Sequence, residues 1–310
     1  MLPHLDDYLL NLQTNNYSEK TVYNYERDLR VFEHYLDKEA KLEFTKLKRR
    51  DIEKYKAYLV SRDRMTASDD KGLKKLNAYS INRMLSALRS YCKYQIDNDY
   101  TCPISPQVIK LTKTVKKHPQ VAELNDIVRL IESPSKFEKE KHIALRNRAM
   151  LEVLFATGMR ISELINLNKN QIDAIGKIFI EGKGRKQRFV YMTDRAKIHI
   201  EKYLNSRKDN HPALFIPYRG SRAGSVNSRI SSNYFQMKIK RYRELLKINV
   251  PTSAHSLRHG FATYLAESGA NPAAIQILLG HESLDTTTRY VNASDKYAEK
   301  THKKYHPLEK

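Results

Sequence analysis

The sequence predicts a mainly α-helical protein with a small β-sheet, divided into a helical N-terminal domain and a mixed α/β C-terminal domain. Three observations support this prediction. Apolar residues recur at helical spacing through the first ~110 residues, two short β-rich segments follow one another after residue 176, and a basic segment without helical periodicity separates the two patterns. A chain of 310 residues is long enough for two domains, each with its own core.

Four helices are expected in the N-terminal domain, because apolar residues there lie three or four positions apart. Ser18 is the predicted N-cap of the second helix. The apolar positions are Leu5, Tyr8, Leu9 and Leu12, then Val22, Tyr25, Leu29, Phe32 and Leu36, then Ile52, Tyr55 and Leu59, and finally Ile81, Leu85 and Leu88. The residues from Arg62 to Asn77 break the period and are predicted to form a loop.

The predicted domains are residues 1–112 and 121–310, joined by a linker at 113–120. Around this linker the chain is basic from Lys110 to Pro119 and shows no helical period. Such a charge run is either a solvated tether or a strap that lies along phosphates, and the sequence leaves both readings open.

The C-terminal domain combines helices with one predicted hairpin. The strands are expected at 177–180 and 188–191, because these segments are apolar and rich in β-forming residues. Helices are expected at 144–167, 196–204, 234–246, 257–268 and 272–279, and a polar helix at 294–305.

The composition favours an intracellular protein that binds a polyanion. The chain carries 56 Lys and Arg against 35 Asp and Glu, a formal net charge of +21. This charge would hold the protein against nucleic acid, although ribosomal, membrane-surface and chaperone-like proteins share it. No apolar run reaches the ~20 residues that span a bilayer, and the start lacks a signal peptide. Cys92 and Cys102 form neither a disulfide framework nor a zinc site, so a cytoplasmic location is expected.

Six side chains form a candidate set for phosphoryl transfer without a metal or other cofactor. They are Arg160, Lys183, His255, Arg258, His281 and Tyr290. Arginine holds the non-bridging oxygens of a phosphate, histidine moves protons, and a phenol can act as the nucleophile. Each of these residues alone is more often structural than catalytic, so the hypothesis depends on their joint presence and order.

The spacing of these residues refines the hypothesis. His255 and Arg258 are three apart and share one face of a helix, whereas His259, adjacent to Arg258, is expected to point elsewhere. Gly280 is expected to end the helix before His281. Lys183 lies in the turn of the predicted hairpin, where it could reach a DNA groove and protonate a leaving oxygen.

Two other phosphate chemistries are excluded. A Walker loop requires glycine at position 177 and Ser or Thr at 184, but these residues are Lys177 and Gly184. The sequence also shows no paired carboxylates of the kind that bind two Mg²⁺ ions.

Five motifs give the chain a resemblance to the tyrosine recombinases, in particular the Xer and phage-integrase-like group. They are ATGMRISEL at 156–164, EGKGRKQR at 181–188, HSLRHGFAT at 255–263, LLGHES at 278–283 and TTTRY at 286–290. The resemblance covers nearly the whole chain and implies a SAM-like core-binding domain and a catalytic domain that together form a C-shaped DNA clamp. It implies that Arg160 and Arg258 clamp the phosphate, Lys183 is the hairpin lysine, His255 handles a proton, His281 is the second histidine, and Tyr290 is the nucleophile.

The resemblance also implies the reaction and the partners. Tyr290 would form a 3′-phosphotyrosyl link at an inverted-repeat site in double-stranded DNA, and a Holliday junction would follow without ATP or metal. Four protomers, alone or with a second recombinase, would assemble on DNA, and residues 295–310 would dock on a neighbouring protomer. The residues after Tyr290 are Val291 and Asn292, where many relatives have Thr and His. The alternatives are a type IB topoisomerase-like enzyme and a non-catalytic DNA-binding relative.

Overall fold

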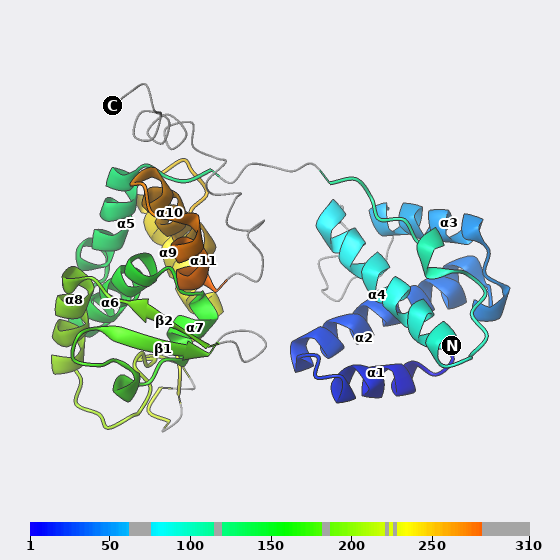
Figure 1. Ribbon diagram of the computed structural model, residues 1–310, viewed down its shortest axis with the longest axis horizontal. Coiled ribbons are helices and arrows are strands. Elements are labelled where there is room, and N and C mark those ends of the chain that lie inside the picture. Colours follow the sequence, from blue (N-terminus) through cyan, green and yellow to red (C-terminus); the bar gives the residue numbers. More distant parts are fainter. Residues whose placement is uncertain (62–75, 115–119, 182–186, 221–222, 226–227, 281–310) are drawn as a thin grey trace. The chain divides into compact units, whose positions relative to one another are not determined.

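A computed structural model describes residues 1–61, 76–114, 120–181, 187–220, 223–225 and 228–280 of the chain (Figure 1). These residues belong to two compact units, Met1–Lys116 and Lys117–Lys310. Lys183, His281 and Tyr290, most of the predicted 62–77 loop and the predicted C-terminal helix lie outside the described residues. Among the residues that are described, no helix is long and apolar enough to cross a membrane.

The four helices predicted for the first unit are confirmed. They are α1 (Leu5–Thr14), α2 (Glu19–His34), α3 (Arg49–Val60) and α4 (Ala78–Asp97). Ser18 caps α2 as predicted, because its side-chain oxygen accepts a hydrogen bond from the Thr21 amide at 3.2 Å. Asn77 caps α4 in the same way and sets the start of that helix. The end of α2 continues into a π-helical turn, Tyr35–Ala40.

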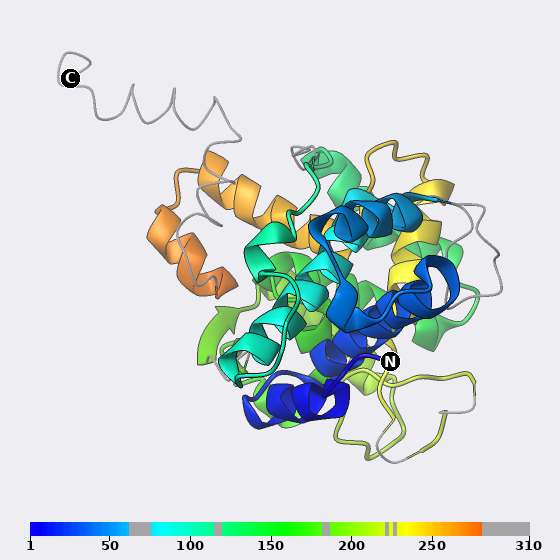
Figure 2. The same ribbon diagram turned by 90° about the vertical axis from the view of Figure 1, so that its right-hand side faces the viewer.

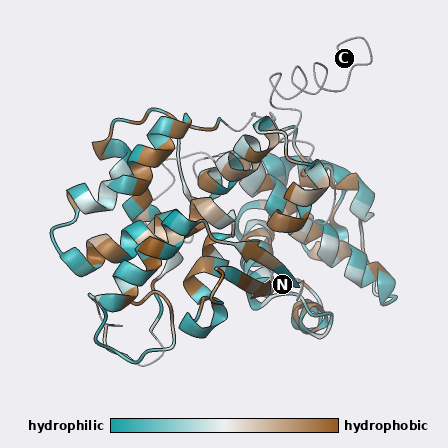
Figure 3. Cartoon of the chain, turned by 60° about the vertical axis from the view of Figure 1, so that its left-hand side comes forward, coloured by the Kyte–Doolittle hydropathy of each residue, from teal (hydrophilic) through white to brown (hydrophobic). Residues whose placement is uncertain are grey.

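The core of the first unit is built from the apolar positions that define the helical periods. Leu29, Ile52, Leu59 and Leu85 have no measurable exposure. Figure 3 shows the resulting division of the helices into brown apolar faces and teal polar faces. A side-chain contact also holds the end of this unit, because Asn82 on α4 exchanges two hydrogen bonds with the backbone of Thr112, at 2.8 and 2.9 Å.

The second unit contains the predicted hairpin and the helices predicted before residue 280, except that the segment predicted as helical at 144–167 is divided into two helices at Gly158. Its helices are α5 (Leu124–Phe137), α6 (Lys141–Thr157), α7 (Ile161–Asn166), α8 (Asp194–Asn205), α9 (Ser232–Leu245), α10 (Ala254–Glu267) and α11 (Pro272–Leu279). Helix α5 was not predicted, although Ile127, Leu130 and Ile131 are spaced as on one helical face. Pro134 lies in the last turn of α5, where it cannot donate to the Leu130 carbonyl four residues before it; the Ser133 hydroxyl donates to that carbonyl at 2.7 Å.

Helix α6 is the centre of the second unit. It packs against α5, α8, α10 and strand β2, so its residues are buried around most of its circumference. Met150, Leu151, Val153 and Leu154 have no measurable exposure, although they point in different directions from the helix. This central position fixes the end of α6, and the residues that follow it form the first part of the site described below.

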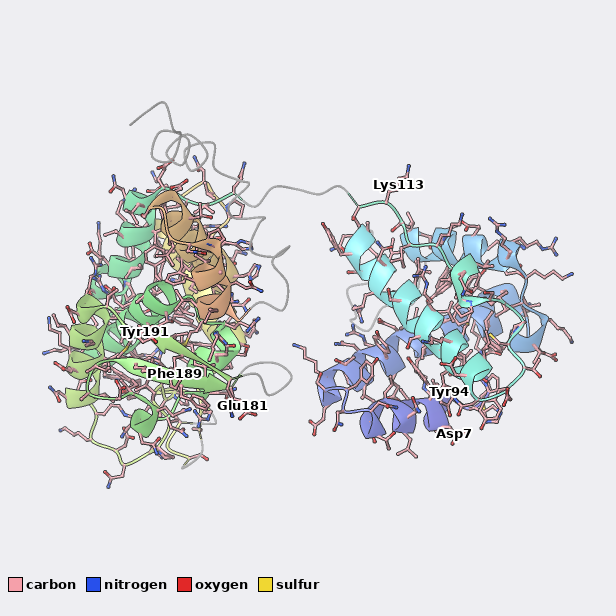
Figure 4. All side chains as sticks on the ribbon, in the orientation of Figure 1. Asp7, Tyr94, Lys113, Glu181, Phe189 and Tyr191 are labelled. Atoms are coloured by element: carbon pink, nitrogen blue, oxygen red, sulfur yellow. The ribbon has the colours of Figure 1, made fainter. Side chains whose placement is uncertain are left out.

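The hairpin consists of strands β1 (Lys177–Glu181) and β2 (Gln187–Tyr191), which are antiparallel, as the prediction of a hairpin requires. Their inner face is buried and contains a charged residue, because Arg188 lies opposite Ile180. The outer face carries the exposed aromatic rings of Phe179, Phe189 and Tyr191, and Figure 4 labels the last two. Helix α11 packs beside β2 (Figures 1 and 2).

Candidate active site

Arg160 lies where α6 ends and α7 begins. Gly158 terminates α6 with a left-handed backbone, φ 61°, and Arg160 is the N-cap residue of α7. The Arg160 amide donates to Glu163 Oε2 at 2.7 Å, and its guanidinium Nη1 donates to Glu163 Oε1 at 2.9 Å. The Arg160 side chain is still 37% exposed, so it is fixed by Glu163 and can also reach a ligand.

Arg258 lies on α10 and is buried, with 3% exposure. Its Nη1 donates to the Gly158 carbonyl at 2.8 Å, and its Nη2 donates to the Leu279 carbonyl at 2.6 Å. One guanidinium group therefore connects the end of α6 with the end of α11. The structure thus brings Arg160 and Arg258, predicted from distant parts of the sequence, to the same place.

Gly158 allows this close approach. A Cβ atom at this position would lie 2.3 Å from the nearest atom of the Phe261 ring on α10. The positive φ is a second obstacle to any larger residue. The glycine therefore lets α10 approach the end of α6 closely enough for Arg258 to reach the Gly158 carbonyl.

Glu163 and Arg188 complete the site, although neither is among the six residues predicted for it. Arg188 donates to both carboxylate oxygens of Glu163, at 2.9 and 2.7 Å, and both side chains are only 6% exposed. Burial raises the pKa of Glu163, but hydrogen bonds from Arg188 and Arg160 outweigh burial and hold the pKa below its usual value. Glu163 is therefore a carboxylate shared between two arginines.

Three arginines meet the carbonyl end of α11. The pairs are Arg188 Nε with the Leu278 carbonyl at 2.9 Å, Arg258 with the Leu279 carbonyl at 2.6 Å, and Arg160 Nη2 with the Gly280 carbonyl at 3.5 Å. The last carbonyls of a helix have no partner within the helix and carry partial negative charge, so cations stabilise them. Gly280 ends α11 with φ 64°, as predicted.

His255 and His259 correct the prediction that His259 points away from the site. Their Nε2 atoms are 2.9 Å apart, and their rings meet edge to face with centroids 4.4 Å apart. The prediction considered only that His259 follows Arg258. The spacing of four from His255 matters more, because residues four apart lie on the same side of a helix.

Both histidines favour the neutral form. Desolvation by burial lowers the pKa of His255, and the charges of Arg258 and Arg160 lower it further. Desolvation, His255 and Arg258 lower the pKa of His259 to about 4. His255 is exposed at the surface, so a neutral imidazole lies near two arginines and can accept a proton.

These shifts predict a loss of stability in acid. Unfolding returns both histidines to an ordinary pKa near 6.5, so the unfolded chain binds more protons between pH 6.5 and about 4. We expect the thermal midpoint of the second unit to be constant above this range and to fall as the pH decreases through it. A His259→Gln variant should show a shallower dependence, and His142→Gln on α6 is the matched control. Equal slopes for all three proteins would contradict this account.

The sequence matches the profiles of two known protein families. The profile of the Phage integrase family matches residues 120–297, more than half of the chain. The profile described as Phage integrase, N-terminal SAM-like domain, matches residues 5–98. The chain is a tyrosine recombinase of the phage integrase family. The first unit of this recombinase is thus its SAM-like domain, and the second is its catalytic domain.

Individual relatives indicate the Xer group. The recombinase is 32% identical over 315 residues to tyrosine recombinase XerC of Staphylococcus aureus (strain USA300 / TCH1516), which covers 99% of this chain and 98% of the relative. It is 28% identical over 311 residues to tyrosine recombinase XerD of Staphylococcus haemolyticus (strain JCSC1435), with 98% of each chain covered. The recombinase is therefore an enzyme of the Xer and integrase type that cuts and rejoins DNA at specific sites.

Solved structures share the fold. A crystal structure of XerH site-specific recombinase bound to a palindromic difH substrate has a TM-score of 0.70 at 21% identity, covering 91% of this chain and 79% of that one. A lambda integrase dimer bound to a COC′ core site has a TM-score of 0.68 at 16% identity, covering 93% and 75%. These comparisons confirm the predicted fold class, which is mainly α-helical with a small sheet.

Proposed function

We propose that this recombinase cleaves DNA by attack of Tyr290 on a backbone phosphate, clamped by Arg160 and Arg258. The observation that carries the proposal is the convergence of both arginines on the carbonyl end of α11. His281 follows that helix end directly in the sequence, and Tyr290 follows nine residues later. The helix end that both arginines contact is therefore only ten residues before the proposed nucleophile in the sequence.

The two arginines supply the electrostatic part of catalysis. Attack on a phosphodiester adds negative charge to the non-bridging oxygens, and preorganised guanidinium groups stabilise that charge. Arg160, Arg188 and Arg258 carry three positive charges and Glu163 carries one negative charge, which leaves this group of four about two charges positive. The surplus suits a phosphate, whose negative charge increases in the transition state.

Proton transfers complete the proposed cleavage. The Tyr290 phenol loses its proton as its oxygen bonds to phosphorus, and the neutral imidazole of His255 accepts that proton. The bond from phosphorus to the 5′-oxygen breaks, and Lys183 protonates that oxygen. The strand then ends in a 3′-phosphotyrosyl link and a free 5′-hydroxyl. Attack by a 5′-hydroxyl of the partner duplex reverses these steps, so neither ATP nor a metal is required.

The partners and the domain roles are part of the same proposal. We expect the two domains, 1–112 and 121–310 with a linker at 113–120, to clamp double-stranded DNA that carries an inverted-repeat site. We expect a tetramer on DNA, alone or with a second recombinase. The likeness to both XerC and XerD supports a second recombinase, and a lambda integrase solved as a dimer on DNA supports self-association. Docking of residues 295–310 on a neighbouring protomer and a cytoplasmic location also remain predictions.

A recombination assay tests this function against a topoisomerase-like activity. Binding sites would first be selected from random-sequence DNA, and two copies would then be placed on one supercoiled plasmid with different flanking markers. We expect exchange of the markers, in the presence of chelator as well as Mg²⁺. Relaxation without exchange would identify a topoisomerase-like enzyme, and an absolute requirement for Mg²⁺ would contradict the proposed chemistry. A plasmid with a single site is the control for exchange between sites.

A further inference from the structure

Arg188 has an unusual position for a strand residue, because its charged side chain lies on the buried face of the hairpin. Three of its nitrogen atoms have partners: Nη1 and Nη2 bind the two oxygens of Glu163, and Nε binds the Leu278 carbonyl. The hairpin, the start of α7 and the end of α11 are thus joined through one guanidinium group. Arg188 is 8% exposed, so it makes these contacts away from bulk water.

The contacts of Glu163 show what Arg188 does for Arg160. Each carboxylate oxygen of Glu163 accepts one bond from Arg188 and one from Arg160, with lengths between 2.7 and 2.9 Å. Without Arg188, the carboxylate would be neutralised by Arg160 alone. The negative charge of Glu163 would then cancel most of the positive charge that Arg160 presents to a phosphate. The Arg160 guanidinium would also be attracted more strongly to Glu163.

The Leu278 contact gives Arg188 a second role, in the geometry of Arg258. Arg258 donates to the carbonyl of the next residue, Leu279, so Arg188 and Arg258 hold consecutive carbonyls of the same helix end. A shift of the end of α11 would therefore change the direction in which the Arg258 guanidinium is held.

We propose that Arg188 is a positioning residue for the reaction. It balances the charge of Glu163, so that Arg160 presents a full positive charge to the phosphate. It also holds the end of α11, to which Arg258 is bonded. Because Arg188 is buried, we expect it to act through Arg160 and Arg258 and not by contact with DNA. This inference rests on the proposed role of Arg160 and Arg258 as the phosphate clamp. It adds a buried residue of the hairpin to the groups that set the rate of cleavage.

Three variants separate the charge of Arg188 from its geometry. Arg188→Lys keeps the charge but loses the fork that binds both carboxylate oxygens and the carbonyl. Arg188→Met loses both, and a Glu163→Gln change in the same chain then removes the unbalanced carboxylate while keeping an oxygen for the Arg160 amide. Arg195→Lys is the matched control, because Arg195 on α8 also forms ion pairs, with Glu152 and Glu132, but outside this site.

The measurement is the rate of covalent adduct formation on nicked DNA carrying a selected site, with thermal unfolding and DNA affinity measured in parallel. Arg188→Lys should slow the reaction on the order of 10- to 100-fold with little change in affinity, since small displacements of catalytic groups have effects of this size. The double variant Arg188→Met/Glu163→Gln should react at least about tenfold faster than Arg188→Met alone.

A substrate with a neutral methylphosphonate at the cleaved position gives a readout that a purely structural role would not change. The transition state of this neutral substrate carries less negative charge and needs less stabilisation by positive charge. The fold reduction in adduct formation caused by Arg188→Met should therefore be smaller on the methylphosphonate than on the natural diester. Equal rates for the unaltered protein and Arg188→Lys, or no gain in the double variant, would overturn the positioning role. Failure of the unaltered protein to form any adduct would instead count against the proposed function.

Discussion

A Tyr290→Phe variant is expected to form no covalent adduct with DNA while it binds its site with unchanged affinity. The phenol oxygen is the proposed nucleophile, and phenylalanine lacks only that oxygen, so the chemistry is lost and the binding surface is kept. The measurement combines a gel-shift titration with an adduct assay on nicked suicide substrates, in which the released fragment prevents religation. We expect loss of the adduct below the limit of detection.

Neighbouring tyrosines provide the control for this result. Tyr297→Phe and Tyr305→Phe change the same chemical group a short distance along the chain and should retain the adduct. Peptide mapping of the adduct from the unaltered protein should give a nucleotide attached to Tyr290. An adduct that persists in Tyr290→Phe and maps to either of the other two tyrosines would show that the nucleophile was assigned wrongly.

Removal of either clamping arginine is expected to slow cleavage by at least about 100-fold, which corresponds to ~3 kcal/mol of transition-state stabilisation. Arg160→Ala removes a partly exposed side chain, so the fold should persist and the loss should appear in the rate. Arg258→Ala also removes two bonds to the Gly158 and Leu279 carbonyls, so a lower thermal midpoint is expected as well.

The control for these arginines is Arg129→Ala on α5, whose ion pair with Asp126 lies on the surface. It should leave both cleavage rate and thermal midpoint nearly unchanged, because exposed ion pairs contribute little. A cleavage rate for Arg160→Ala within about twofold of the unaltered protein would remove Arg160 from the proposed clamp.

Much of the fold could be predicted from local patterns. The helices of the first unit follow from apolar periods, and the β1–β2 hairpin follows from two short apolar runs around a glycine-rich turn. Helix α5 was not predicted, although Ile127, Leu130 and Ile131 lie at helical spacing in the sequence. The structure shows that this helix packs against α6 and continues past Pro134 to Phe137.

The sequence motifs predicted part of the candidate site correctly in position. Arg160, His255 and Arg258 lie together, as expected from the motifs that contain them. Glu163 and Arg188 lie in two of the same motifs, but they were missed because their roles depend on burial and on a contact between residues 25 positions apart, which the motifs do not reveal. The contact between His259 and His255 could have been predicted, because the two residues are four positions apart in a predicted helix.

The close contact at Gly158 has a consequence for how the gene can change over generations. Alanine at this position must accept both a left-handed backbone and a Cβ atom 2.3 Å from the Phe261 ring. A smaller residue at position 261 would relieve the second obstacle but would leave a cavity and would not relieve the first. The placement of Arg258 therefore depends on glycine at position 158. We expect substitutions at 158 to be rare among functional descendants of this gene and to occur together with a change at 261.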